Sequence, residues 1–85
     1  MHTVYVIQND ETKEVYIGYT DDLKRRLQEH NNAGLKFTTR KRGEWRLIYV
    51  EGYRAEKDAR DREQKLKAHG SGKQELMKRL KASML

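Results

Sequence analysis

Two short segments near the start of the chain constrain the fold more than any other feature. Residues 3–8 and residues 14–18 are rich in β-branched and aromatic side chains, which favour β-strands. Few residues separate them, and residues 9–12 have the polar composition of a turn. Two strands joined by so short a connection are predicted to form an antiparallel hairpin.

Each predicted strand carries a tyrosine near its centre, Tyr5 in the first and Tyr16 in the second. A turn centred between residues 10 and 11 would pair them directly and place both phenols on one face of the sheet. A slip of one residue would pair Tyr5 with Ile17 instead. Gly18 ends the second strand on the face of Tyr16, and its missing side chain would let a ligand approach the backbone. The alternative is that both tyrosines belong to the core and Gly18 marks a bend.

The remainder of the chain is predicted to form three helices and one further strand. A helix capped by Thr20 is expected to end near residues 31–32. Residues 45–50 are the most strand-like segment, and we expect them to form the central, most buried strand. Helical spacing predicts a helix over about residues 54–68 and a last helix that begins at Ser71. The element order is therefore β-β-α-β-α-α, typical of the α+β class.

The composition excludes several classes of protein. The chain length suits one small domain, residues 1–85, with a thin core. The absence of cysteine rules out disulfides, a disulfide-linked partner and thiolate zinc sites. No apolar run approaches the roughly 20 residues that a membrane span needs, and the start of the chain lacks a secretory signal pattern. We therefore expect a cytoplasmic protein with no membrane partner.

The charge of the chain indicates a polyanionic partner. Lysine and arginine number 19 against 13 acidic residues, which gives a formal net charge of +6. A basic surface attracts phosphate and releases condensed counterions on binding. Four of these charges, Lys36, Arg40, Lys41 and Arg42, lie in a predicted loop over residues 32–44 and are candidate substrate contacts. Nucleic acid is the favoured partner, although many small proteins are basic without binding it.

The first predicted helix has polar residues within its apolar stripe. Leu23 and Leu27 mark the inward face, which residues at i, i+3, i+4 and i+7 share. Arg26 and His30 occupy the other two positions of that stripe, and burying them without partners would be costly. One interpretation is that Arg26 extends its stem over the edge of the core and His30 bonds a backbone carbonyl. The other is that both serve a functional site.

The helix predicted over residues 54–68 shows the same anomaly. Glu63 lies four residues after Ala59 and three before Leu66, so a carboxylate falls on the apolar stripe. An ion pair with one of the 19 lysines and arginines would account for it. A second interpretation is a metal ligand, because hard cations such as Mg²⁺ favour carboxylate oxygen.

Together these elements would bring phenol, guanidinium, imidazole and carboxylate groups to one face of the sheet, beside a basic loop. Arginine stabilises negative charge on transition-state oxygens, and a metal held by a carboxylate neutralises a leaving oxygen. Histidine or tyrosine moves a proton. This set of groups is suited to hydrolysis of a phosphodiester.

The same residues resemble the motifs of the GIY-YIG endonuclease family. Residues 3–5, Thr-Val-Tyr, match the first motif loosely, and residues 16–18, Tyr-Ile-Gly, match the second closely. Residues 23–31 resemble the helix signature of the family, and residues 59–67 resemble its metal-glutamate helix. The similarity covers about residues 3–80. It is closest to the short stand-alone members and extends to the catalytic module of excision-repair nucleases.

The resemblance implies a three-stranded antiparallel sheet flanked by helices, and an endonuclease that hydrolyses DNA phosphodiester bonds with one divalent ion, Mg²⁺ or Mn²⁺. Carried over by position, Glu63 would hold the metal, Arg26 would stabilise charge on the phosphate, and Tyr16 would act as general base. Tyr5 and His30 would assist by hydrogen bonding and proton relay. Such an enzyme would act on structured or single-stranded DNA in repair or recombination, leaving a 5′-phosphate and a 3′-hydroxyl.

Two positions depart from the family pattern. Thr3 stands where the first motif has glycine, which would alter how closely DNA approaches the strand. Tyr19 follows Gly18 where some repair-nuclease relatives have a lysine, so a phosphate contact there would be weaker. Neither departure removes a proposed catalytic group.

Two other functions fit the same sequence. A non-catalytic nucleic-acid-binding module would keep the fold and the basic loop without the chemistry. An interaction module would dock a partner through the apolar stripe of the last helix, formed by Met77, Leu80 and Met84, although core packing explains that stripe more simply.

Overall fold

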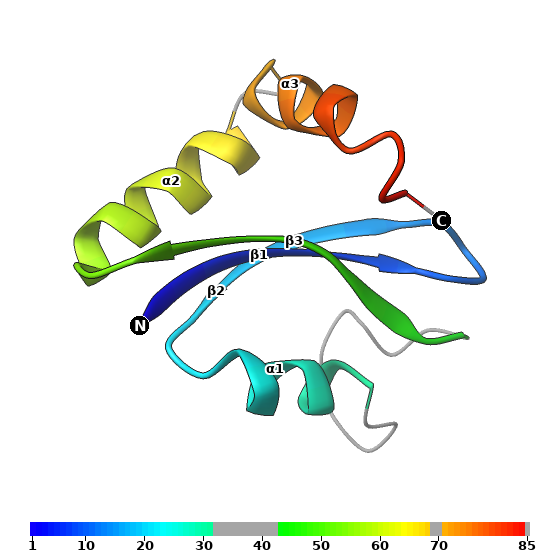
Figure 1. Cartoon of the computed structure of the whole chain (residues 1–85), viewed down its shortest axis with the longest axis horizontal. Helices are drawn as coiled ribbons and strands as arrows, with labels where there is room; N and C mark the ends of the chain where they lie inside the picture. Colours follow the sequence, from blue (N-terminus) through cyan, green and yellow to red (C-terminus); the bar gives the residue numbers. More distant parts are fainter. Residues whose placement is uncertain (32–42, 69–70, 85) are drawn as a thin grey trace.

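The protein is a three-layered α+β structure, and a computed structural model describes its residues 1–31, 43–68 and 71–84. One antiparallel sheet has the strand order β2-β1-β3 and contains β1 (His2–Asn9), β2 (Val15–Thr20) and β3 (Trp45–Tyr53). The helices are α1 (Leu23–His30), α2 (Glu56–Ala68) and α3 (Ser71–Arg79). Helix α1 covers one face of the sheet, and α2 and α3 cover the other (Figure 1). The expected architecture and element order are confirmed.

The central strand is β1, and the prediction that residues 45–50 would be central is wrong. Residues 4–9 of β1 are all buried, because strands flank both edges and helices cover both faces. In contrast, β3 lies at an edge of the sheet, where Leu47 and Val50 are exposed. An edge strand also packs some of its side chains against the core, and this packing accounts for the apolar residues of β3.

The β1–β2 hairpin pairs Tyr5 with Gly18 and Ile7 with Tyr16. The direct pairing of Tyr5 with Tyr16 was therefore wrong, and so was the slip that would pair Tyr5 with Ile17. The observed register differs from the first of these by two residues. Because successive side chains of a strand point to opposite faces, a shift of two residues leaves both phenols on the same face.

The turn of this hairpin explains the shift in register. The backbone N–H of Asn9 donates to the carbonyl of Glu14, so the turn is centred later in the chain than predicted. The Asn9 side chain accepts backbone hydrogen bonds of 2.9 Å from Glu11 and Thr12. Lys13 completes the turn in the left-handed region, with φ of 65°. A buried asparagine thus sets the register by bonding its own turn.

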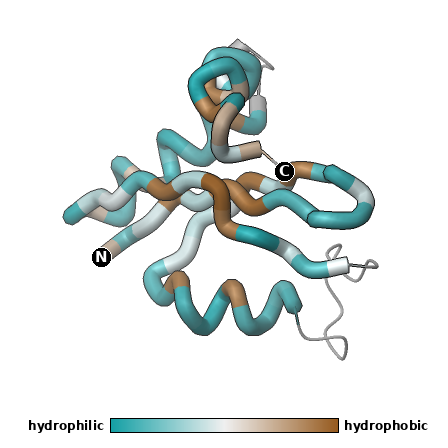
Figure 2. The backbone as a smooth tube through the Cα atoms, turned by 45° about the vertical axis from the view of Figure 1, so that its right-hand side comes forward, coloured by the Kyte–Doolittle hydropathy of each residue, from teal (hydrophilic) through white to brown (hydrophobic). Residues whose placement is uncertain are grey.

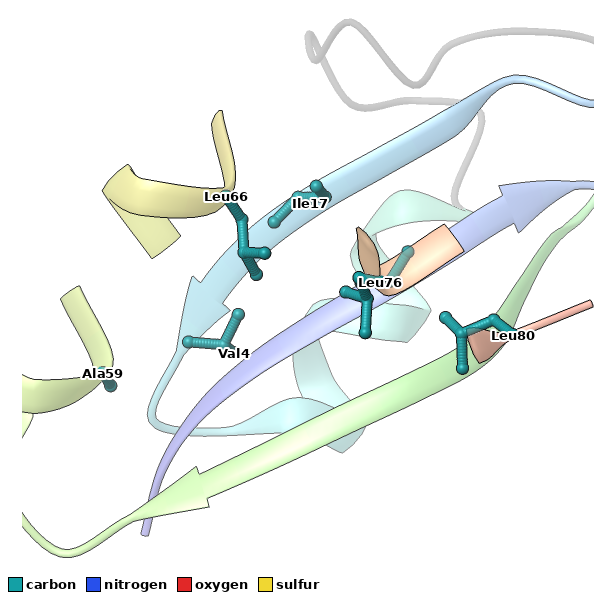
Figure 3. Close-up of a cluster of buried hydrophobic side chains, with 7 residues drawn as sticks. Val4, Ile17, Ala59, Leu66, Leu76 and Leu80 are labelled. Carbon is teal, nitrogen blue, oxygen red and sulfur yellow. The ribbon is translucent and has the colours of Figure 1, made fainter. Parts of the chain in front are cut away.

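The two faces of the sheet have different cores. On the face of α2 and α3, the buried side chains are aliphatic, as Figure 3 shows, and consist of Val4, Val6, Ile17, Ala59, Leu66, Leu76 and Leu80. Met77 and Met84 pack against this aliphatic cluster, so the apolar stripe of the last helix belongs to the core and is not a partner surface. On the face of α1, the cluster is largely aromatic and contains Tyr5, Ile7, Trp45, Tyr16, Leu23 and Leu27. Figure 2 shows the helices to be mostly hydrophilic outside these contacts.

A charged clamp ties α2 to β3. Glu51 accepts hydrogen bonds from the hydroxyls of Tyr49 (2.6 Å) and Tyr53 (2.5 Å) and from Nε of Arg62 (2.9 Å). Burial opposes ionisation of this carboxyl, but the hydrogen bonds from Arg62 and the two tyrosines outweigh it and lower the pKa of Glu51 to about 2. The clamp therefore stabilises the fold as a charged group.

The helix starts differ slightly from the predicted ones. The residue that caps α1 is Asp22, whose side chain accepts the N–H of Arg25 at 3.1 Å, so the predicted cap at Thr20 is wrong. The hydroxyl of Thr20 instead accepts the backbone N–H of Asp22 at 3.0 Å. Helix α2 begins at Glu56, two residues after the predicted start near residue 54. Within the described parts of the chain, no helix has the length and apolar character needed to cross a membrane.

Candidate active site

Tyr5, Tyr16 and His30 meet in one cluster beneath α1. The hydroxyl oxygen of Tyr5 lies 2.8 Å from Nε2 of His30, in a buried hydrogen bond. The ring centroids of Tyr16 and His30 are 4.9 Å apart in an edge-to-face arrangement, and those of Tyr5 and Tyr16 are 6.3 Å apart. The indole of Trp45 lies 6.4 Å from the imidazole. The structure thus brings together the two phenols and the imidazole that the sequence singled out.

Helix α1 carries His30 and Arg26 to this face through the predicted stripe. His30 is buried, whereas Leu23, Arg26 and Leu27 are half-buried. Nη1 of Arg26 lies 3.5 Å from a carboxylate oxygen of Glu29, so its charge is partly balanced within the helix. The position of both polar residues on the inward face follows from their spacing with the leucines.

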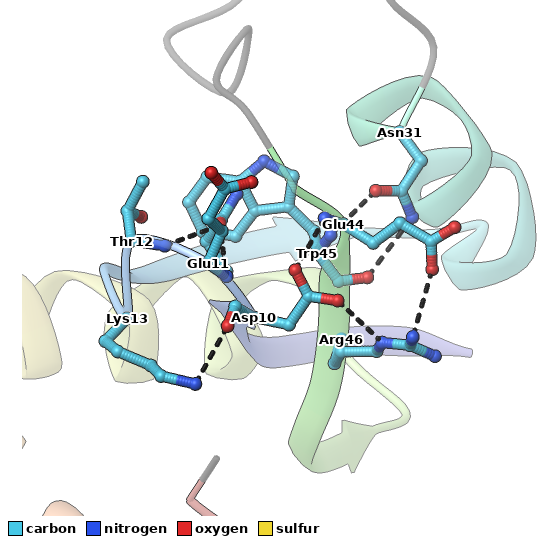
Figure 4. Close-up of polar contacts among 9 residues, drawn as sticks. Asp10, Glu11, Thr12, Lys13, Asn31, Glu44, Trp45 and Arg46 are labelled. Atoms are coloured by element: carbon cyan, nitrogen blue, oxygen red, sulfur yellow. Dashed lines mark hydrogen bonds and ion pairs between the residues drawn. The ribbon is translucent and has the colours of Figure 1, made fainter.

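The C-terminal end of α1 is anchored to β3 by Asn31 (Figure 4). The side-chain oxygen of Asn31 accepts the N–H of Trp45 at 2.8 Å, and its amide donates to the Trp45 carbonyl at 3.2 Å. The start of β3 is held in turn by Arg46, which pairs with Asp10 at 3.6 Å and with Glu44 at 3.3 Å. These contacts keep the last turn of α1 over the tyrosines.

Gly18 provides the space that the Tyr5 ring occupies. A Cβ atom at this position would overlap the hydroxyl group of Tyr5 and would lie 2.9 Å from Cε1 of Tyr16. Gly18 is also buried, so the backbone approach that the sequence suggested for a ligand is filled by the protein itself. The glycine allows the Tyr5 phenol to extend over β2 and reach His30.

A groove of about 380 Å³ lies along the edge strand β2, between α1 and α2. Its lining is Tyr19, Thr20, Asp21, Arg26, Glu56, Arg60 and Glu63. Arg26 and Glu63 therefore line the same groove, although their helices lie on opposite faces of the sheet (Figure 1). Because β2 is an edge strand, side chains from both faces extend past it and line the same groove.

Glu63 is held close to the aromatic cluster by Lys67. The glutamate side chain is 18% exposed, and its Oε2 accepts a hydrogen bond of 3.0 Å from Nζ of Lys67. The same ammonium group lies 5.6 Å from the centre of the Tyr16 ring. Glu63 was predicted from the sequence but Lys67 was not, although a lysine four residues after a glutamate in a helix is a recognisable pairing signal.

Arg60 and the surroundings of Tyr19 were also missed. The Arg60 guanidinium lies 4.4 Å from the centre of the Tyr19 ring, and its Nε donates to Glu56 at 2.7 Å. The Tyr19 hydroxyl is 2.7 Å from Nδ1 of His2. The groove therefore contains a second guanidinium group, stacked on the tyrosine that stands where some relatives have a lysine.

Burial determines the protonation of the tyrosine–histidine pair. It raises the pKa of Tyr5 above its ordinary value, and the neighbouring Tyr16 and Glu63 add to this effect. It also lowers the pKa of His30, and the nearby Arg26 lowers that pKa further. At pH 7 the pair is therefore a neutral phenol bonded to a neutral imidazole.

The residues around the groove fit a metal that is shared with a substrate. Among the described residues, no group of three or more histidine, aspartate or glutamate side chains is arranged to hold an ion. Glu63 offers a single carboxylate, and Mg²⁺ is commonly held by one or two carboxylates together with substrate phosphates and water. The donor set therefore fits Mg²⁺ or Mn²⁺ bound beside a phosphate and does not fit a closed zinc site.

The predicted basic loop lies outside the described residues. Lys36, Arg40, Lys41 and Arg42 all fall in the segment between residues 31 and 43, so their contact with a substrate stays a prediction.

Comparison with known proteins connects this groove with a nuclease family. The family model of the GIY-YIG catalytic domain matches residues 1–76, which include the groove and the aromatic cluster. The chain belongs to the GIY-YIG family. The two motifs that the family is known by lie on β1 and β2 of this structure, and membership implies a nuclease-type protein that binds nucleic acid.

Individual relatives of this GIY-YIG protein are UPF0213 proteins. One from Clostridium perfringens is 38% identical over 69 residues, which are 79% of this chain and 71% of that protein. One from Halobacterium salinarum is 42% identical over 69 residues, 79% of this chain and 86% of that protein. The solution NMR structure of a UPF0213 protein from Bacillus halodurans matches with a TM-score of 0.57 and 32% identity, covering 94% of this chain and 84% of that one. The resemblance to short stand-alone members of the family is thus confirmed.

Proposed function

We propose that this GIY-YIG protein is a metal-dependent endonuclease that hydrolyses DNA phosphodiester bonds. The observation that best supports this function is the single groove that Arg26 lines from α1 and Glu63 lines from α2. A guanidinium group is suited to a phosphate, and a carboxylate is suited to a hard divalent cation. The ammonium group of Lys67, which is bonded to the same carboxylate, also lies 5.6 Å from the centre of the Tyr16 ring.

Each group would have a distinct role. Arg26 would pair with the phosphate under attack and stabilise the negative charge that develops on its oxygens. Tyr16 would take a proton from the attacking water, while Tyr5 and His30 would hold the Tyr16 ring in place and relay the proton. Burial makes Tyr5 itself a poor base, because it raises the pKa of that phenol.

Glu63 would hold Mg²⁺ or Mn²⁺. When bound, this cation supplies positive charge that stabilises the oxygen leaving from phosphorus. The water oxygen forms a new bond to phosphorus, and the bond from phosphorus to the 3′ oxygen breaks. The products would be a 5′-phosphate and a 3′-hydroxyl. We include in this proposal structured or single-stranded DNA as the substrate, in repair or recombination, on the model of the excision-repair modules that the sequence resembles.

Two substitutions test this function in a cleavage assay with single-stranded, nicked and branched DNA and either metal. We expect Arg26→Ala to lower the cleavage rate about 10²- to 10³-fold, because it removes a stabilising group from the transition state. Glu63→Gln is expected to abolish cleavage, because the amide binds a divalent cation poorly. Arg25→Ala and Glu75→Gln make the same changes at exposed positions and should leave the rate unchanged.

The controls separate the alternatives. If the unaltered chain binds DNA but leaves every substrate intact with both metals, the non-catalytic nucleic-acid-binding module becomes the better interpretation. If cleavage persists in Glu63→Gln, then Glu63 does not hold the metal. Amide NMR spectra of both variants would show that the fold is retained.

A further inference from the structure

Lys67 lies near two residues of the proposed site, Glu63 and Tyr16. Its ammonium group donates to Oε2 of Glu63 at 3.0 Å and lies 5.6 Å from the centre of the Tyr16 ring. The lysine side chain is about half exposed, whereas the glutamate is mostly buried. A cation that belongs to the chain thus occupies an oxygen of the carboxylate that is proposed to hold the metal.

Arg26 and Arg60, the two arginines that line the groove, have carboxylate partners of their own. Nε of Arg60 is paired with Glu56 at 2.7 Å. Nη1 of Arg26 lies 3.5 Å from Glu29. Lys67 is the cation whose hydrogen bond holds the Glu63 carboxylate.

We propose that Lys67 is a positioning residue that holds Glu63 until a divalent cation takes the carboxylate, and that it then pairs with a phosphate of the DNA. This inference rests on the proposed function. A divalent cation on Glu63 repels the nearby ammonium group, and a phosphate in the groove offers that group a new partner. The metal and the DNA then strengthen each other's binding. The metal releases Lys67 to pair with a phosphate, and the phosphate takes up the ammonium group that would otherwise repel the metal.

The first step is tested by titrating the protein with Mn²⁺ alone. Binding is detected as paramagnetic broadening of the amide NMR signals around residue 63. Lys67→Met keeps the apolar stem but removes the charge, and we expect Mn²⁺ to bind about three- to tenfold more tightly. Lys67→Arg retains the charge and should bind Mn²⁺ with nearly the original affinity. Lys65→Met removes an exposed charge two residues away on α2 and serves as the matched control. Equal Mn²⁺ affinities in Lys67→Met and the unaltered chain would overturn the proposal.

Glu63→Gln separates this inference from the proposed function. If Mn²⁺ still broadens the same signals in this variant, Glu63 is not the metal ligand, and both proposals fall. If Glu63→Gln abolishes the broadening while Lys67→Met behaves like the unaltered chain, the role of Lys67 alone is overturned.

DNA binding in the presence of a chelator tests the second step. In Glu63→Gln the lysine has lost its carboxylate, so it should already contact a phosphate. Adding Lys67→Met to this variant should weaken binding of a single-stranded oligonucleotide about three- to tenfold and reduce the salt dependence by about one charge. The control is the double variant in which Lys65→Met is added to Glu63→Gln, which also removes one charge from α2. Unchanged affinity and salt dependence in the Lys67 double variant would overturn the phosphate contact.

Discussion

The fully buried side chains on the face of the sheet beneath α2 and α3 are aliphatic, whereas the cluster beneath α1 contains two phenols, an imidazole and an indole as well as aliphatic groups. Aliphatic packing is not directional, so it stabilises the fold without fixing the orientation of any polar atom. The aromatic face contains polar atoms that need partners, such as the buried pair of Tyr5 and His30. The buried core of the first face is therefore non-directional, and the clamp at Glu51 supplies directional contacts beside it, whereas the core of the second face itself contains oriented polar groups.

The two faces also differ in how their helices are held. Helix α2 is attached by buried side chains such as Ala59 and Leu66, and by the clamp at Glu51. Helix α1 has eight residues, too few to be stable alone, and relies on its inward stripe and on the hydrogen bonds of Asn31 to β3. The groove lies where the two arrangements meet at the edge of β2. Three substitutions test this contrast.

The largest effect is expected from a change in the aliphatic face. Leu66 is completely buried, and Leu66→Ala removes its contacts and leaves a cavity. We expect the free energy of unfolding to fall by about 2–5 kcal/mol, measured by chemical denaturation. Leu47→Ala, at an exposed position of β3, should change it by less than about 0.5 kcal/mol. Similar losses of unfolding free energy in both variants would contradict the conclusion that the buried aliphatic cluster contributes most of the stability.

An intermediate effect is expected at the clamp, in a defined range of pH. The pKa of Glu51 is about 2 in the folded protein against an ordinary value of 4.5, so the unfolded chain takes up the proton first. The clamp therefore contributes its full stability above about pH 4.5 and loses it as the pH falls toward 2. Glu51→Gln should cost about 1.5–3 kcal/mol at pH 7, because it replaces charge-assisted hydrogen bonds.

Urea denaturation across this pH range would measure the effect. The Glu51→Gln variant should lose less stability on acidification than the unaltered chain does. Glu75→Gln, on the exposed surface of α3, is the matched control and should follow the unaltered chain. An identical acid dependence in all three proteins would contradict the assignment of the clamp.

The smallest effect on stability is expected in the aromatic face. Tyr5→Phe removes the hydroxyl bonded to His30 and should lower the free energy of unfolding by about 1 kcal/mol, since the ring packing remains.

The pKa of His30 is lowered in the folded protein, so the unfolded chain binds the proton first, and stability should decline as the pH falls below about 6.5. An NMR titration of the imidazole would measure this. A pKa above 6.5 would contradict the buried, neutral state described for His30.

Much of the fold followed from local patterns. Two segments rich in β-branched and aromatic residues predicted the hairpin, and helical spacing predicted the inward stripe that carries Arg26 and His30. Glu63 was recognisable because a carboxylate on an apolar stripe needs a partner. In contrast, the register of the hairpin depended on how the buried Asn9 bonds its own turn. The edge position of β3 depended on which strands pair with one another in the sheet, and the pattern within one strand does not indicate this.

The contacts within the site were the least predictable part. The approach of Lys67 to Tyr16 and the stacking of Arg60 on Tyr19 depend on the conformations of long side chains from different elements. Gly18 was recognised as unusual, but its reason, the passage of the Tyr5 ring over β2, required the register to be known.

Local spacing along the chain was enough to indicate which elements form, which of their faces are apolar, and which polar residues interrupt those faces, because these properties depend on neighbours within one helix or strand. The central place of β1, the position of Tyr5 over Gly18, and the arrival of Arg26 and Glu63 at one groove from opposite faces became known only from the folded chain. Those outcomes depend on how separate elements pack around an edge strand. Such packing is set by the free energy of the whole chain and not by any one segment.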